Sequence, residues 1–295
     1  MQEPHPIDAL TRRAWLQRGA ATLLGAGAVT SSHALRSEET ASPPEPIRPG
    51  AARVWRPKID LEFTEPGGIA QWWVPELVLL GNTDVMLSAR GPAPWKRDGE
   101  NWSYEKKTMD GQLYVAVKVE RVKLGWRASM TLGNRSAKTW NDVVSPVCLQ
   151  LRGSPAFADA DWTRTYYRSG GELLTYREAE TGGGRNIYRM SLVKDQKQIK
   201  RTPRHQRKWG FTKRQSDDGI FAVIDKNRTT VLTTHWQPTH HLQANLKRSF
   251  ACIHANPFFG RLQPGESRTR HGCVLLVPGS LERAWEATRA LMKTS

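Results

Sequence analysis

The chain has 295 residues, of which 38% are hydrophobic and 24% are charged. This balance is typical of a globular protein and excludes a chain that is disordered throughout. Three cysteines exclude a disulfide framework, because at most one pair can form, and we expect all three to be small buried residues. The formal net charge of +16 favours anionic partners such as nucleic acid, acidic lipid or acidic polysaccharide.

The first part of the chain has the pattern of an export leader. Residues 11–18, Thr-Arg-Arg-Ala-Trp-Leu-Gln-Arg, resemble the twin-arginine signal motif, with Arg12 and Arg13 as the paired arginines. The apolar run 19–29 that follows is too short to span a bilayer. Ala34 ends a segment with small residues at the positions that a signal peptidase reads, so cleavage after Ala34 is expected.

We therefore predict a signal peptide over 1–34 and a disordered linker over 35–50, which is rich in Pro, Ser and Glu. The alternative is an ordinary amphipathic N-terminal helix. Export places the protein in the periplasm or outside the cell, with the twin-arginine translocase as its partner during export. We predict no stable membrane anchor and no nucleic acid partner. Of the three classes of anionic partner, acidic lipid and acidic polysaccharide remain.

Alternating apolar and polar residues predict strands through most of 51–295. The segments 113–119, 126–132 and 147–151 each place an apolar residue at every second position, which makes one face of a strand apolar. Asp-Gly pairs between such runs supply turns. Three further runs are rich in β-branched residues, at 220–224, 229–234 and 273–277.

One segment has the spacing of a helix. Ser280 can cap it, and apolar residues, including Trp285, recur every three or four positions from Leu281 to Leu291. This predicts a helix over 280–293 that packs its Trp285 face on the strands. Many strands, frequent turns and one late helix predict an all-β fold, a large antiparallel β-sandwich of supersandwich type with a C-terminal helix.

Two parts of the sequence carry resemblances to known families. The region 113–151 and the run Cys-Ile-His-Ala-Asn-Pro-Phe-Phe-Gly at 252–260 resemble a family of exported bacterial β-sandwich proteins without an assigned activity. The turn Leu-Gln-Pro-Gly-Glu-Ser at 262–267 is similar to the final hairpins of galactose-mutarotase-like supersandwiches. The second resemblance implies a carbohydrate context by analogy of fold. The acid and base residues of mutarotases match no positions in this sequence.

Histidines gather late in the chain. Three histidines around an open position can hold a zinc ion, but the spacing of His235, His240 and His241 fits no standard metal motif. Pro238 suggests that the adjacent pair lies in a loop, and the alternative to a metal site is scattered, hydrogen-bonded surface histidines. No metal ligand is therefore assigned, and no cofactor is expected.

His254 is distinguished by its neighbours. In a strand it lies on the same face as Cys252 and Asn256, and Pro257 is expected to end that strand, which places Asn256 at a rim. A His and an Asn at such a position can bind a sugar hydroxyl or transfer a proton, so His254, Asn256 and His235 are the candidate catalytic residues. The alternative is a His bonded to the backbone and an Asn that caps a turn.

Asp159 and Asp161 are the candidate carboxylate pair. A glycosidase pair normally comes from separate segments, so a solvated loop is the expected structure, with Asp161 and Arg164 as an ion pair.

The stretch 185–214 is the most strongly charged part of the chain. It contains eleven Lys or Arg and one acid, Asp195, with Tyr188, Trp209 and Phe211 between them. Basic groups neutralise sulfate, carboxylate or phosphate, and aromatic faces stack on sugar rings or bases. The alternative is a solvated insertion without a ligand. The predicted ligand-binding residues are Arg164, Lys200, Arg201, Arg204, Arg207, Lys208, Trp209 and Trp236.

The sequence thus predicts an exported β-sandwich protein that binds or processes polysaccharide, anionic in the favoured form and neutral otherwise. Two alternatives stay open: a metal-dependent enzyme with a His-based site, and a cell-envelope structural protein without a small ligand. Whether the protein is an enzyme is also left open.

Overall fold

The computed structural model describes residues 58–63, 66–80, 86–87, 95–108, 111–180, 188–199, 210–245 and 251–294. The predicted leader and linker, with Arg12 and Arg13, lie outside these ranges. Outside them too are the predicted ligand residues Lys200, Arg201, Arg204, Arg207, Lys208 and Trp209. In the described ranges, no helix is long and apolar enough to cross a membrane.

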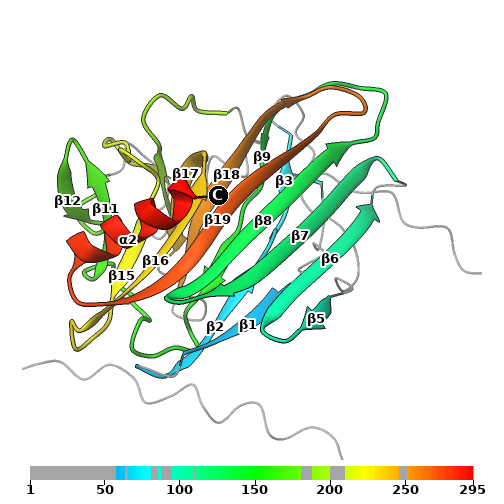
Figure 1. The fold of residues 1–295 in the computed structure, drawn as a ribbon. Helices are drawn as coiled ribbons and strands as arrows, with labels where there is room; N and C mark the ends of the chain where they lie inside the picture. Colours follow the sequence, from blue (N-terminus) through cyan, green and yellow to red (C-terminus); the bar gives the residue numbers. More distant parts are fainter. Residues whose placement is uncertain are drawn as a thin grey trace, which may run out of the picture. The chain divides into compact units, whose positions relative to one another are not determined.

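The described strands form two large sheets that pack on each other (Figure 1). The first, which we call sheet I, contains in spatial order β1 (Lys58–Phe63), β2 (Gly68–Trp73), β10 (Cys148–Gln150), β18 (Cys252–Leu262), β17 (Thr239–Asn245), β13 (Tyr188–Leu192) and β14 (Gly210–Phe211). Three strands extend sheet I beside β18: β9 (Trp140–Val144), β3 (Val78–Leu79) and β4 (Met86–Leu87).

The second sheet, sheet II, contains in spatial order β12 (Glu172–Thr175), β11 (Thr165–Ser169), β15 (Phe221–Ile224), β16 (Thr230–Gln237), β19 (Ser267–Pro278), β8 (Gly125–Asn134), β7 (Leu113–Val122), β6 (Asn101–Thr108) and β5 (Lys96–Asp98). Its neighbouring strands are all antiparallel. In sheet I, β13 and β14 are parallel. The predicted antiparallel β-sandwich is confirmed.

An apolar core fills the space between the sheets. In β7 the alternate residues from Leu113 to Val119 point into it, whereas Lys118 is exposed, which is the period of two that the sequence shows. Trp72 of sheet I and Trp236 of sheet II meet in this core with ring centroids 6.2 Å apart. Burying a large apolar side chain of this kind stabilises the fold by about 1.5–3 kcal/mol.

The predicted C-terminal helix is present as α2 (Leu281–Lys293). Ser280 caps it, since its hydroxyl accepts a hydrogen bond from the Arg283 backbone amide. The helix covers the outer face of sheet II over β16 and β19 (Figure 1). Trp285 lies in a second apolar cluster there, as predicted, and its indole donates to Asp218 Oδ2 at 3.1 Å.

Two predictions about strand ends are wrong. β18 does not end at Pro257 but continues to Leu262, because β18 changes partner there from β17 to β9. A proline is tolerated at a point where its residue donates no ladder hydrogen bond. Pro238 does not place the adjacent histidines in a loop either, because it occupies the tight turn between β16 and β17, and β17 begins at Thr239.

Candidate functional site

The outer face of sheet I is polar. In β18, Ile253 and Ala255 point into the core, so Cys252, His254 and Asn256 point to the other face. All three are nevertheless buried. Buried polar groups are costly unless each has a partner, so a sheet face that collects them needs an explanation beyond packing. This face is the candidate functional site.

Five carboxamides lie on this face. Residues that pair across antiparallel strands point to the same side, so the register identifies them. Gln150 of β10 pairs with Gln71 of β2 on one side and with Cys252 of β18 on the other. Gln243 of β17 pairs with His254. The carboxamide face consists of Gln71, Gln150, Gln243, Asn245 and Asn256.

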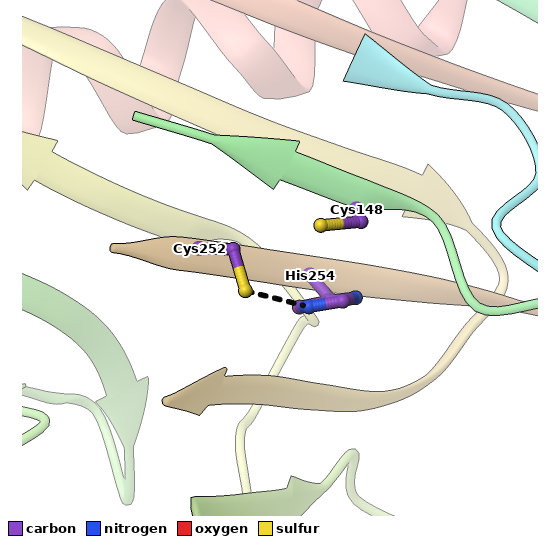
Figure 2. Close-up of side chains that lie close together, drawn as sticks. All are labelled: Cys148, Cys252 and His254. Carbon is purple, nitrogen blue, oxygen red and sulfur yellow. Dashed lines mark hydrogen bonds between the residues drawn. The ribbon is translucent and has the colours of Figure 1, made fainter. Parts of the chain in front are cut away.

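Two cysteines and a histidine meet at the centre of the carboxamide face. Figure 2 shows Cys252 and His254 on the same strand, with Cys148 beside them on a neighbouring strand. The two Sγ atoms and a ring nitrogen of His254 all lie within 4.8 Å of one another, and Cys252 Sγ is 3.4 Å from His254 Nε2. Asn245 Nδ2 donates to Cys252 Sγ at 2.6 Å, and Glu76 Oε2 lies 3.8 Å from His254 Nδ1.

The surroundings shift Cys252 toward its thiolate form and His254 toward its protonated form. The hydrogen bond with Cys148, together with the His254 ring and the Asn245 amide, holds the pKa of Cys252 well below its ordinary value, although burial opposes this. Burial lowers the pKa of His254, but the Cys252 sulfur and the Glu76 carboxylate raise it by more, so this pKa lies above its ordinary value. The thiolate is the form of cysteine that binds metals and attacks electrophiles.

Asn256 and the two adjacent histidines form a hydrogen-bonded chain next to this centre. Asn256 Oδ1 accepts from the Val147 amide at 3.1 Å, so its Nδ2 donates to His241 Nε2 at 2.9 Å. His241 Nδ1 must then carry the proton that it donates to His240 Nδ1 at 2.8 Å, and His240 Nε2 donates to the Lys197 carbonyl at 3.0 Å. Asn256 is therefore buried and bonded within the sheet, and the prediction of a rim position is wrong.

The predicted catalytic residues do not converge. His254 and Asn256 share the carboxamide face, two residues apart on β18. His235 lies on β16 in sheet II, with its Nδ1 3.1 Å from the Gly219 carbonyl oxygen. Trp236 points into the core, so His235 points to the outer face of sheet II, away from sheet I. A zinc site that combines His235 with the histidines of β17 is therefore not formed.

Two predicted ligand-binding residues are used inside the fold. Trp236 is fully buried against Trp72, so it does not line a surface site. Arg164 donates to three backbone carbonyl oxygens at 2.7, 2.8 and 3.0 Å, which holds its guanidinium between loop and strand.

The expected solvated loop around Asp159 is also corrected. Asp159 is buried and accepts from the Arg164 amide at 2.9 Å and from Thr165 Oγ1 at 2.7 Å. Asp161 is exposed and lies 3.8 Å from Arg177, and the Arg164 guanidinium lies 3.9 Å from Asp159 instead. The two carboxylates serve the local fold.

Sequence reasoning missed Cys148, Glu76 and Gln243 as members of the site. Cys252 and His254 were readable as neighbours, because residues two apart on a strand share a face. Cys148 is more than a hundred residues away from them in the sequence, and only the pairing of β10 with β18 places it beside them. The prediction that all three cysteines are buried is confirmed, and none of them forms a disulfide.

Comparisons with known proteins identify no family. No protein-family model matches the chain. No curated protein matches it either. A putative aldose 1-epimerase from Escherichia coli K12 is similar in structure, with a TM-score of 0.38 and 10% identity over 76% of this chain and 80% of that chain. A galactose mutarotase-like protein from Clostridium acetobutylicum has a TM-score of 0.37 and 11% identity over 76% of this chain and 78% of that chain.

A protein from Synechocystis sp. PCC 6803 has a TM-score of 0.39 and 9% identity, over 75% of this chain and 96% of that chain. One of these three neighbours is of the mutarotase-like type that the turn at 262–267 resembles. TM-scores this low assign neither a family nor an activity to this chain. The resemblance to an exported β-sandwich family stays a prediction.

Proposed function

We propose that the carboxamide face binds a carbohydrate, and that the protein binds or processes polysaccharide outside the cytoplasm. The observation that carries this proposal is the presence of five carboxamides on one face of sheet I. A carboxamide offers two donor hydrogens and an acceptor oxygen. A sugar hydroxyl also donates and accepts, so the carboxamides match a ligand rich in hydroxyl groups.

The margin of this face suggests where a ligand enters. Trp73 pairs with Cys148 and shares the carboxamide face, but it is only 9% exposed and lies in one buried cluster with Cys148 and Cys252. Gln71 is partly exposed, and the Glu76 side chain is 25% exposed, whereas Gln150 and Gln243 are each only 7% exposed. A ligand that arrives over β2 meets Gln71 and Glu76 before the buried amides.

An acidic polysaccharide is the finer form of this proposal. Its support is the net charge of +16 and the basic stretch 185–214, whose lysines and arginines would neutralise acidic groups along the polymer. The uncharged amides would take the hydroxyl groups of the same polymer. Neutral glycans therefore test the carboxamide face, and acidic glycans test the added contribution of the basic stretch.

The experiment is a glycan array followed by calorimetric titration with the best-bound member. Gln71→Ala and Gln243→Ala each remove hydrogen bonds to the ligand, and we expect each to weaken binding by about tenfold, since one hydrogen bond is worth about 1 kcal/mol or slightly more. Gln112→Ala is the matched control, because Gln112 is exposed in the turn before β7, far from sheet I in the pairing order. Its binding should equal that of the unaltered protein.

The proposal fails if no glycan binds, or if all three variants bind as the unaltered protein does. Binding of acidic glycans alone, unchanged by the Gln71 and Gln243 substitutions, assigns the affinity to surface charge and overturns the role of the carboxamide face. Absence of all binding favours the remaining alternative, a structural protein of the cell envelope.

A further inference from the structure

We infer that Cys148, Cys252 and His254 form a binding site for a thiophilic metal ion, Zn²⁺ or Cu⁺. The inference concerns the centre of the carboxamide face, but it does not depend on whether that face binds a carbohydrate. It rests on the spacing of the three ligand atoms, on the position of the two cysteines in the sheet and on the environment of the histidine.

The spacing of the ligand atoms suits a single ion. Metal–sulfur bonds of about 2.3 Å and metal–nitrogen bonds of about 2.0–2.1 Å place the ligand atoms of a tetrahedral ion about 3.5–3.8 Å apart. Cys252 Sγ and His254 Nε2 are 3.4 Å apart, and all three ligand atoms lie within 4.8 Å of one another. Small side-chain rotations therefore suffice to bring them around one ion.

The position of the cysteines argues against a disulfide as the alternative. Gln150 pairs with Cys252, so Cys148, two residues earlier, lies diagonally from Cys252 across the β10–β18 pair. Diagonal neighbours in an antiparallel pair have Cα atoms about 7–8 Å apart, and a disulfide cannot bridge Cα atoms more than about 7 Å apart without moving the backbone. A metal ion between the two sulfur atoms can bridge cysteines whose Cα atoms are too far apart for a disulfide.

The environment of His254 is that of a metal-bound imidazole. A histidine that binds a metal through Nε2 carries its proton on Nδ1 and usually donates it to a carboxylate. His254 is 2% exposed, and its Nδ1 makes no hydrogen bond within the described residues. The carboxylate of Glu76 lies 3.8 Å from this nitrogen, close enough to receive the proton after a small shift. The Cys252 sulfur also has a partner, because the Asn245 amide donates a hydrogen bond to it.

The donor set points to the class of ion. Two thiolates and one imidazole are soft or intermediate ligands, which select Zn²⁺ or Cu⁺ over Mg²⁺ and Ca²⁺. Among the described residues, no further His, Cys, Asp or Glu joins this group, so three protein ligands leave one position of a tetrahedral ion open. The bound ion would also supply the positive charge that compensates the thiolates ligating it.

The test is a titration of the full chain with Co²⁺ under reducing conditions, after removal of bound metal with a chelator. We expect strong thiolate-to-cobalt charge-transfer absorption, which Zn²⁺ then displaces. Glu76→Gln should keep this absorption and weaken Co²⁺ binding by about 10–100-fold, the usual effect of losing the partner of a ligating histidine. Cys148→Ala and Cys252→Ala should weaken binding further and reduce the charge-transfer intensity.

Cys273→Ala is the matched control, because Cys273 is equally buried but lies in the apolar cluster beneath α2. It should bind Co²⁺ as the unaltered chain does. The inference is overturned if the folded, unaltered chain shows no charge-transfer absorption, or if Cys273→Ala reduces it as much as Cys148→Ala does. Neither readout needs a sugar ligand, so failure of the metal site and failure of carbohydrate binding are told apart.

Discussion

At the scale of single residues, His235 shows how burial changes a titration. Its ring is almost fully buried on β16, and its Nδ1 lies 3.1 Å from the Gly219 carbonyl oxygen. Burial lowers the pKa of His235 below its ordinary value, because a charged imidazolium is poorly solvated there, and the Gly219 carbonyl only partly offsets this. The folded protein therefore holds His235 in its neutral form at neutral pH.

The pH dependence of stability follows from this shift. The unfolded chain takes up a proton at His235 near pH 6.5, whereas the folded chain does so only at lower pH. Stability that is present above pH 6.5 is therefore lost as the pH falls below it, by at most about 1.4 kcal/mol per pH unit. We expect urea unfolding at pH 7.5 and pH 5.5 to show a smaller loss in His235→Gln than in the unaltered protein.

The pKa of His254 is shifted in the opposite direction, but His254 is present in both proteins, so its effect on stability cancels in the comparison. Equal losses of stability in the two proteins would contradict the assignment of His235 as a buried neutral histidine.

At the scale of elements, α2 is attached to sheet II through one face. Ala284, Trp285, Thr288 and Met292 are its buried residues, at the spacing of a helix, and Thr288 Oγ1 lies 2.8 Å from Thr233 Oγ1. The Trp285 indole fills the cluster between helix and sheet and also donates to Asp218. Most of the stability of the helix should therefore come from this contact and not from its intrinsic propensity.

Trp285→Ala tests this attachment. We expect a loss of about 3–5 kcal/mol in the free energy of unfolding, measured with urea, because the substitution leaves a cavity and removes one of the donors to Asp218. Glu286→Ala changes the adjacent exposed residue and should alter stability by no more than about 0.5 kcal/mol. A similar effect of both substitutions would mean that α2 contributes little to the folded domain.

Elements with clear alternation were predictable, and those with polar faces were not. β7 and β8 follow from period-two runs of apolar residues, β19 from a run rich in β-branched residues, and α2 from its cap and spacing. β17 lacks that signal, because its residues are buried on both faces while many of them are polar. The path of β18 through Pro257 depends on a change of partner strand, which no local pattern reveals.

The candidate site was predictable to the same limited extent. His254 and Asn256 were identified from their shared face on one strand. Cys148, Glu76 and Gln243 enter only through pairing between distant strands or through packing, so their roles depend on register. His235 and Trp236 were assigned to a site by residue type alone, and the fold uses both elsewhere.

At the scale of the whole molecule, topology and the proposed export route are consistent with each other. β10 pairs with both β2 and β18, and β19 pairs with both β8 and β16. Each sheet therefore forms only after segments far apart in the sequence have come together. The twin-arginine route carries folded proteins, which suits a sandwich with so many long-range pairings. Folding in the reducing cytoplasm would also let Cys148 and Cys252 come together as thiols before the protein meets an oxidising compartment.

The export proposal has its own test. Arg12→Lys with Arg13→Lys keeps the charge of the leader but replaces two planar guanidinium groups by ammonium groups, which cannot make the same paired hydrogen bonds. We expect the full-length precursor to accumulate in the cytoplasm, as measured by cell fractionation and immunoblotting. Arg18→Lys makes the same chemical change outside the pair and should leave export intact, with a mature N-terminus at Leu35. Normal export of the double variant would show that the pair is not read as a signal, and the location of the protein would then have to be explained by another route.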